Sequence, residues 1–488
     1  MFGLTPSLIR NTACVAFILT FLTCMTAPIA NDLGERPNII VLLSDDQGWG
    51  DVGYNGHPVL HTPNLDDMAS EGVRFDRFYA AGHVCTPTRA SLLTGRHPNR
   101  MGAFTWGHSL RPQELTLPEI LSQHGYTTAH FGKWHVGSVL SESPVNPGAS
   151  GFQEWISAPN FFDFSPLLSH KGEVVETNGE GSEIIVDLAI DFLESRAEDD
   201  GPFFIAIWFG NPHKPHIAED EDRILYSDYP EDVANFYAET TAIDRTVGTL
   251  RTYLEQSGLR ENTIVWYLGD NGGLPDIGLN GGRESKGSIY EGGLRVPSVM
   301  EWPRGFPQPQ IIETPASTSD VLPTILDVAN IAYPASRPLD GTSLLDTIRS
   351  ETADFSRPLT FWKFYDVPGI RMNSDTIMSI ASNDGDDENA ADLLYLDAGV
   401  IRTTYDEDFF EGHAAILEWP WKLHRIEKSA WYDFAWSRNP VTELYNLEDD
   451  PLETTNLIEE REDVAMRLMA DLEEWQASVI RSLNGEDY

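Results

Sequence analysis

The sequence predicts an α/β fold: a large domain with a mostly parallel central sheet sandwiched by helices, then a smaller C-terminal α+β subdomain with a short antiparallel sheet. Short, continuous apolar runs recur along the first part of the chain, and helical patterns separate them. This alternation is typical of a parallel sheet, because each parallel pair needs a crossover connection. After residue 355 tryptophans become frequent and short strand-like pieces dominate.

Four apolar runs are short enough for buried strands and lack the alternation of a half-exposed strand. They lie at residues 38–43, 129–131, 203–209 and 263–268. Helical periodicity occurs at residues 183–194, 232–254, 320–329 and 463–483. We therefore expect a large domain over residues 31–355 and a subdomain over residues 356–488.

Residues 1–30 have the pattern of a secretory signal peptide. Arg10 precedes an apolar run over residues 13–25, which ends in small residues around Ala27 and Ala30. We expect this segment to be removed, the protein to be exported to the periplasm or secreted, and no stable membrane insertion to remain. An uncleaved anchor and a lipoprotein site at Cys24 are the alternatives.

The charge of the chain excludes some classes of partner. Its 33 basic and 76 acidic residues give a net charge of −43, so little is available to neutralise the phosphates of a nucleic acid or an anionic membrane surface. With the signal peptide removed, Cys85 would be the only cysteine, and no intramolecular disulfide could form.

Polar side chains follow two of the predicted strands at the point where each strand ends. Asp45 and Asp46 follow the run at residues 38–43, and Asp270 and Asn271 follow the run at residues 263–268. Ligands of open α/β sheets collect beyond the carboxyl ends of strands. Three carboxylates and an amide suit Ca²⁺ or Mg²⁺ and suit Zn²⁺ poorly. Helix caps and turns are the alternative role for each of these residues.

Cys85 lies just before a helical segment predicted at residues 88–94, with Pro87 near its first turn, where proline is tolerated. A helix N-terminus attracts anions, and Arg89 lies one turn further on. On chemistry alone, Cys85 could be a nucleophilic thiol or a buried, inert cysteine.

Basic residues follow the remaining strands and a glycine-rich loop. Lys133 and His135 follow the run near residue 129, and His213 follows the run at residues 203–209, where His216 competes for any role. Lys286 lies in the glycine-rich loop. Each could also be an ordinary structural histidine or surface lysine. His83 is the unassigned histidine that we most expect near the site.

Taken together, these segments resemble a known family. CTPTRASLLTGR (residues 85–96) is similar to the sulfatase signature, and PNIIVLLSDDQGWGDVG, GKWHVG, NPHKPH, GDNGG and KGSIYEGGLRVP occur in the order of that family. ELYNLEDDPLETTNL resembles the family's closing strand and turn. The chain therefore resembles type I formylglycine-dependent sulfatases, arylsulfatase-like members of the alkaline phosphatase superfamily, and bacterial carbohydrate sulfatases in particular.

The resemblance implies an alkaline-phosphatase-like large domain and a modified residue 85. A maturation enzyme would oxidise Cys85 to 3-oxoalanine (Cα-formylglycine), whose hydrate attacks the sulfur of a sulfate ester. A Ca²⁺, or a Mg²⁺ in its place, would be bound by Asp45, Asp46, Asp270 and Asn271, with residue 85 as a further ligand.

The resemblance also implies roles for the basic residues. Arg89 would hold the hydrate and the sulfate, while Lys133 and Lys286 would neutralise sulfate oxygens. His213 would be the acid that protonates the departing alcohol, and His135 the base that releases sulfate from residue 85.

The expected substrate is a sulfated carbohydrate. Trp419, Trp421, Trp431 and Trp436 could stack on sugar faces, although packing is the simpler role for them. One rival function is hydrolysis of phosphonate monoesters or phosphodiesters by a member of the same superfamily. Another is a catalytically silent protein that binds anionic glycans in the same pocket.

Overall fold

The structure is a computed structural model, and it describes residues 36–350, 357–365, 367, 369, 372–382, 403–427 and 440–488. The expected signal peptide, Trp431 and Trp436 lie outside these residues. Among the helices that the structure describes, none is both long and apolar enough to cross a membrane.

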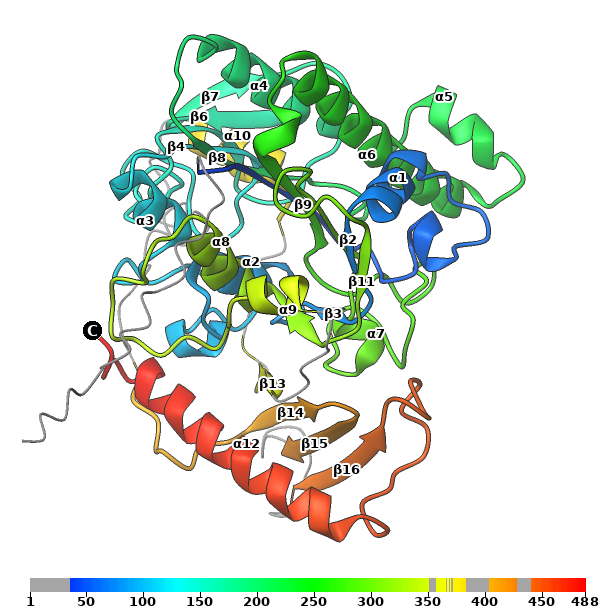
Figure 1. Ribbon diagram of the computed structural model, residues 1–488, viewed down its shortest axis with the longest axis vertical. Helices are drawn as coiled ribbons and strands as arrows, with labels where there is room; N and C mark the ends of the chain where they lie inside the picture. The colour runs from blue at the N-terminus through cyan, green and yellow to red at the C-terminus, as the bar shows by residue number, and fades with distance from the viewer. Residues whose placement is uncertain are drawn as a thin grey trace, which may run out of the picture. The chain divides into compact units, whose positions relative to one another are not determined.

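A ten-stranded sheet forms the centre of the large domain (Figure 1). In spatial order its strands are β11 (Gln310–Ile312), β2 (Val73–Phe75), β10 (Ser298–Glu301), β9 (Thr263–Gly269), β1 (Asn38–Ser44), β8 (Phe203–Trp208), β4 (Thr127–Lys133), β5 (Glu154–Ala158), β6 (Leu167–His170) and β7 (Glu173–Glu176). A two-stranded sheet, β3 (Phe78–Tyr79) and β12 (Ala316–Ser317), lies apart from it.

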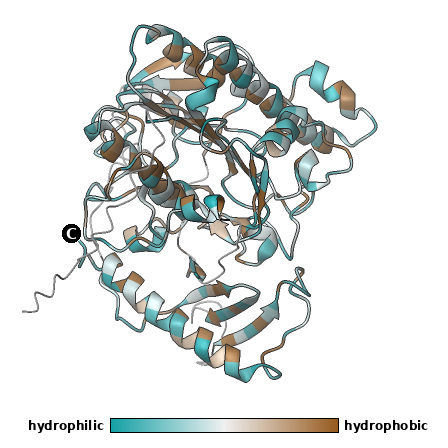
Figure 2. Ribbon diagram, viewed as in Figure 1, coloured by the Kyte–Doolittle hydropathy of each residue, from teal (hydrophilic) through white to brown (hydrophobic). Residues whose placement is uncertain are grey.

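The five strands from β9 to β5 are mutually parallel, and the predicted apolar runs are four of them. Hydrophobic residues are concentrated along these strands (Figure 2). In β1, Ile40 and Leu42 enter a core cluster with residues of α4 and α6, and the intervening residues are equally buried. A strand covered on both faces reads as a continuous apolar run, which explains why these strands could be predicted.

Helices cover both faces of the sheet. One group comprises α1 (Pro63–Glu71), α4 (Gly181–Ser195), α5 (Asp220–Arg223) and α6 (Glu231–Gln256), which pack against one another. Another comprises α2 (Cys85–Thr94), α3 (Leu117–Gln123), α8 (Val321–Val328) and α9 (Leu345–Arg349). Short helices α7 (Glu291–Leu294) and α10 (Ser374–Ser382) belong to the loops around these layers.

A separate antiparallel sheet follows in the C-terminal part. Its strands are β13 (Leu359–Phe364), β14 (Gly412–Glu418), β15 (Trp421–Glu427) and β16 (Val441–Asn446), in that spatial order. One face packs against the amphipathic helix α12 (Glu462–Leu483). The other face packs through Phe361 and Leu417 against Tyr79 and Tyr290 of the large domain. The predicted fold class is confirmed, and the boundary at residues 355 and 356 stays a prediction.

Candidate active site

The two acidic pairs meet because their strands are neighbours in register. Ser44, the last residue of β1, pairs with Gly269, the last residue of β9. Asp46 then donates its backbone N–H to Asp270 Oδ1 at 3.2 Å, and Asn271 Nδ2 donates to Asp46 Oδ1 at 2.9 Å. Asp46 adopts a left-handed backbone with φ of 63°, which turns the chain sharply after the strand. All of these residues are buried.

Cys85 joins this acidic cluster from the start of α2. Its Sγ donates to Asp45 Oδ1 at 3.2 Å, and one ligand atom from each of Asp45, Asp46, Cys85 and Asp270 lies within 4.8 Å of the others. The helix begins at Cys85 itself, three residues before the start that we predicted, so Pro87 is its third residue. Burial, and then the neighbouring Asp45, raise the pKa of the thiol well above its usual value. A thiolate nucleophile is therefore disfavoured.

Arg89 connects the acidic cluster to β4. Its Nε and Nη2 donate to Asp270 Oδ2 at 3.1 and 2.8 Å, and its Nη1 donates to the carbonyl of Lys133 at 2.9 Å. The guanidinium also lies over the ring of Trp208, 5.3 Å from the centroid. Arg89 is wholly buried and is fixed by contacts on three sides, so its charge is held in one position.

Two lysines approach the acidic cluster from opposite sides. Lys133, the last residue of β4, donates Nζ to Asp45 Oδ2 at 2.5 Å. Lys286, from the loop before α7, donates Nζ to Asp46 Oδ2 at 2.7 Å. Burial opposes ionisation of Asp45, but Lys133 above all holds the pKa of this carboxyl well below its usual range. The buried carboxylates are therefore paired with one buried and one half-buried lysine.

His213 lies at the rim of the acidic cluster. Its Nε2 is 3.7 Å from Asp46 Oδ2, and its Nδ1 is 2.6 Å from the carbonyl of Lys214. Because a carbonyl only accepts, Nδ1 carries a proton and Nε2 is the nitrogen that faces the cluster. Burial lowers the pKa of His213 to about 4. The ring stacks on Phe161, with centroids 4.0 Å apart.

His135 is buried beside Lys133 in a left-handed backbone conformation, with φ of 58°. Neither ring nitrogen has a hydrogen-bond partner among the described residues, although the backbone carbonyl accepts from Thr86 Oγ1 at 2.7 Å. Burial, and then Lys133 and Arg89, lower the pKa of His135 well below its usual value. The ring is therefore neutral and can accept a proton.

The donor set of the acidic cluster fits a hard cation. Asn271 Oδ1 is buried and has no hydrogen-bond partner among the described residues, while its Nδ2 is fully engaged. Burial, and then the nearby Asp45, raise the pKa of Asp270. An unpaired amide oxygen beside crowded carboxylates is the arrangement that a Ca²⁺ or Mg²⁺ would relieve.

The structure thus brings together the ten residues to which the sequence analysis assigns catalytic or metal-binding roles. It also adds residues that we did not predict. Phe161 lies in the loop after β5, and the pattern around it gave no signal of a stacking partner for His213. The carbonyl of His83 accepts from Gly287 N–H at 2.9 Å, so His83 contacts the Lys286 loop through its backbone, as its expected proximity suggested.

The described tryptophans of the C-terminal part lie in packed positions. Arg77 lies over Trp419, 3.9 Å from the ring centroid, and Arg461 lies over Trp421 at 4.5 Å. Trp421 also packs against the core of α12. Packing therefore accounts for these two residues, and sugar stacking remains an untested expectation.

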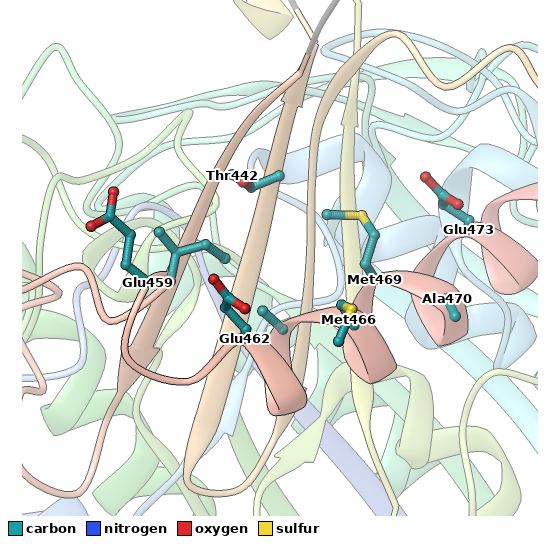
Figure 3. Close-up of a pocket in the computed structure, with 9 residues that line it drawn as sticks. Thr442, Glu459, Glu462, Met466, Met469, Ala470 and Glu473 are labelled. Carbon is teal, nitrogen blue, oxygen red and sulfur yellow. The ribbon is translucent and has the colours of Figure 1, made fainter.

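A pocket of about 510 Å³ lies in the C-terminal part of the chain, against β16 and α12 (Figure 3). It is lined by Thr442, Ile458, Glu459, Glu462, Ala465, Met466, Met469, Ala470 and Glu473. Three glutamates accompany apolar side chains, and the lining contains no cation. An anionic ligand would be repelled there, so the acidic cluster with its ring of cations is the better candidate site.

Comparison with known proteins gives a consistent result along the chain. The family model described as Sulfatase matches residues 37–331, and a second, described as the C-terminal part of N-sulphoglucosamine sulphohydrolase, matches residues 282–383. N-acetylgalactosamine-6-sulfatase of Mus musculus is 32% identical over 376 residues, which are 67% of this chain and 69% of the relative. The ulvan-active sulfatase of Formosa agariphila is 32% identical over 349 residues, or 67% and 68%.

Solved structures share the fold. The crystal structure of Ps i-CgsB matches with a TM-score of 0.74 and 24% identity, over 91% of this chain and 93% of the other. The phosphonate monoester hydrolase of Agrobacterium radiobacter matches with a TM-score of 0.60 and 19% identity, over 91% and 96%. Since a phosphonate monoester hydrolase shares this fold, the fold alone does not decide the chemistry of the site.

Proposed function

We propose that this chain, which belongs to the sulfatase family, hydrolyses sulfate esters of a sulfated carbohydrate at the acidic cluster. Membership makes the protein a sulfuric ester hydrolase. One observation carries the assignment of the site: Cys85 Sγ lies 3.2 Å from Asp45 within a buried cluster that Arg89, Lys133 and Lys286 surround.

A divalent cation belongs to this proposal. Asp45, Asp46, Asp270 and Asn271 would hold Ca²⁺, or Mg²⁺ in its place, with residue 85 as a further ligand. When bound, the cation would act as a Lewis acid on the sulfate and its nucleophile. The unpaired Oδ1 of Asn271 and the crowded carboxylates support this assignment.

Residue 85 would be matured to Cα-formylglycine by a formylglycine-generating enzyme. As a hydrate, it would supply one hydroxyl oxygen that bonds to sulfur while the S–O bond to the departing alcohol breaks and the alcohol takes up a proton. Loss of the proton of the second hydroxyl would then break the C–O bond to sulfate and restore the aldehyde, so no water need attack sulfur. The position of Cys85 at the start of α2 directs it toward Asp45. No other cysteine is found in the described residues, so none there can compete by forming a disulfide.

The three cations stabilise charge that accumulates on the sulfate oxygens. Arg89, Lys133 and Lys286 are held by Asp270, Asp45 and Asp46, so they need not reorganise when negative charge develops. Arg89 would hold the hydrate and the sulfate, and the lysines would neutralise sulfate oxygens. Lys286 would also lie near the leaving oxygen.

His213 and His135 would divide the proton transfers. With Nδ1 committed to the carbonyl of Lys214, His213 can present only Nε2 to the leaving oxygen, and a bound sulfate favours its protonated form. His135 is neutral and has unpaired nitrogens, so it can accept the proton whose removal releases sulfate.

His213→Ala should therefore slow most the hydrolysis of sulfate esters that have a poor leaving group. We expect kcat/KM for a sugar sulfate to fall by about 100-fold or more, and for an aryl sulfate with a good leaving group by less than about tenfold. Steady-state kinetics on both esters measures the difference. His216→Ala is the matched control, because His216 binds Asp232 and should affect both esters equally. Equal losses in His213→Ala would argue against its role as the acid.

The relatives support a sulfated saccharide as substrate, since one is an N-acetylgalactosamine-6-sulfatase and another an ulvan-active sulfatase. The alternative is hydrolysis of phosphonate monoesters or phosphodiesters, which the similar fold of a phosphonate hydrolase keeps open. We also propose that residues 1–30 direct export of the protein and are then removed, and that residues 31–355 and 356–488 form the catalytic domain and the subdomain.

Product release distinguishes these functions. Protein produced with a maturation enzyme should liberate inorganic sulfate from a panel of sulfated saccharides and leave an aryl phosphonate essentially intact. Mass spectrometry of the peptide containing residue 85 should show the aldehyde in place of the thiol. Faster hydrolysis of the phosphonate would favour the alternative, and binding of saccharides without turnover would favour the silent glycan-binding protein.

A further inference from the structure

The loop that carries Lys286 is held in place by contacts of Gly287, the residue after Lys286. Gly287 donates its N–H to the carbonyl of His83 at 2.9 Å, two residues before Cys85. The carbonyl of Gly287 accepts from Lys363 Nζ at 2.9 Å. Lys286 itself donates its backbone N–H to the carbonyl of Gly273 at 3.0 Å. The position of Lys286 thus depends on two contacts outside the loop between β9 and α7, with His83 and Lys363, and on one within it, with Gly273.

Lys363 belongs to the C-terminal sheet, not to the large domain. It lies in β13, two residues after Phe361, and strand alternation places both on the same face. Phe361 packs in the cluster that contains Tyr290 of the large domain. In the register of β13 and β14, Lys363 pairs with His413. The face of the sheet opposite α12 therefore delivers an ammonium group to the active-site loop.

The environment of Lys363 differs from that of the other described lysines. Five of them form ion pairs with carboxylates: Lys133, Lys171, Lys214, Lys286 and Lys422. Lys363 has no such pair among the residues that the structure describes, although the whole chain has a net charge of −43. Its described acceptor is a backbone carbonyl, so its contribution in the structure is to hold a peptide group.

We propose that Lys363 is a positioning residue, through which the C-terminal sheet fixes Lys286 in the active site by way of the Gly287 carbonyl. The inference rests on the proposed function, in which Lys286 neutralises sulfate oxygens. Gly287 has φ of 91°, a conformation with little steric restraint for glycine, so the contacts of its peptide groups determine where the loop lies. Loss of the Lys363 contact would let the ammonium of Lys286 move relative to Asp46.

Lys363→Met tests this coupling because it removes the donor and keeps an apolar stem of similar length. We expect kcat/KM to fall by about tenfold or more, as for loss of a charged hydrogen bond. The loss should be the same for a monosulfated monosaccharide and for a longer sulfated oligosaccharide. Lys363→Arg keeps a donor and should recover activity to within about threefold of the wild type.

A double-mutant cycle tests whether Lys363 acts through Lys286. In the Lys286→Ala background, adding Lys363→Met should lower kcat/KM by no more than about twofold, because residues that act as one unit are not additive. Lys171→Met is the control for loss of a surface lysine and should retain wild-type activity. If Lys363→Met does not fold, Lys363→Gln replaces it in the cycle.

The outcomes separate this inference from the proposed function. A wild type that releases no sulfate from either saccharide contradicts the function itself. If the wild type is active, three results overturn the inference alone: activity of Lys363→Met equal to the wild type, additive losses in the cycle, or a loss confined to the oligosaccharide, which would mean direct contact with substrate.

Discussion

Cys85→Ala should abolish turnover while leaving the fold intact. If residue 85 provides the nucleophile, its removal leaves only binding and charge stabilisation, and kcat should fall by at least about 10⁴-fold. The side chain makes a single described hydrogen bond, to Asp45, and Cys and Ala differ by one sulfur atom. We therefore expect the thermal midpoint to fall by no more than about 4 °C. Release of inorganic sulfate and circular dichroism measure the two effects.

Ser91→Ala is the matched control for this substitution. Ser91 lies in the same helix and is as deeply buried, and its hydroxyl has no hydrogen-bond partner among the described residues. Its loss should change neither turnover nor the helix. Near wild-type activity of Cys85→Ala would contradict every step that we assign to residue 85. If Ser91→Ala were inactivated to the same extent, the loss of activity in Cys85→Ala would reflect damage to α2 and not the loss of a nucleophile.

The two halves of the acidic cluster could be predicted because each follows a strand that is recognisable in the sequence. A buried parallel strand reads as an uninterrupted apolar run, and the residue after it must lie at the carboxyl edge of the sheet. The sequence alone could not show that β1 and β9 are adjacent, and this adjacency is what joins Asp45 and Asp46 to Asp270. Resemblance to the sulfatase family, rather than periodicity, assigned roles to the histidines and lysines.

Other features depend on contacts that no local pattern encodes. Phe161 stacks on His213 across loops that are 52 positions apart in the sequence, and the chain around Phe161 resembles any aromatic turn. Lys363 reaches Gly287 only because β13 pairs in one register and its sheet packs on Tyr290. The start of α2 was predicted three residues late because proline is tolerated anywhere in the first turn, where N–H groups lack helical acceptors.

Removal of divalent cations should lower both activity and stability. Exhaustive chelation should reduce turnover by more than about 100-fold, as expected when a Lewis acid and its bound nucleophile are lost. The thermal midpoint should fall as well, because a ligand present at 100 times its Kd stabilises the folded state by about 2.7 kcal/mol. Addition of Ca²⁺ or Mg²⁺ should restore both, and elemental analysis should find the ion in the untreated protein.

The substitution Asn271→Leu tests whether this cation binds at the acidic cluster. It removes an amide oxygen that has no other described partner, so we expect weaker binding of Ca²⁺ and a smaller shift of the thermal midpoint when the ion is added. Asn99→Leu is the control, because Asn99 is equally buried but donates to the carbonyl of Trp362 in the C-terminal sheet. It should lower the midpoint by the same amount with and without Ca²⁺. Full activity and an unchanged midpoint after chelation would refute the metal site, because the crowded carboxylates would then be balanced by Arg89, Lys133 and Lys286 alone.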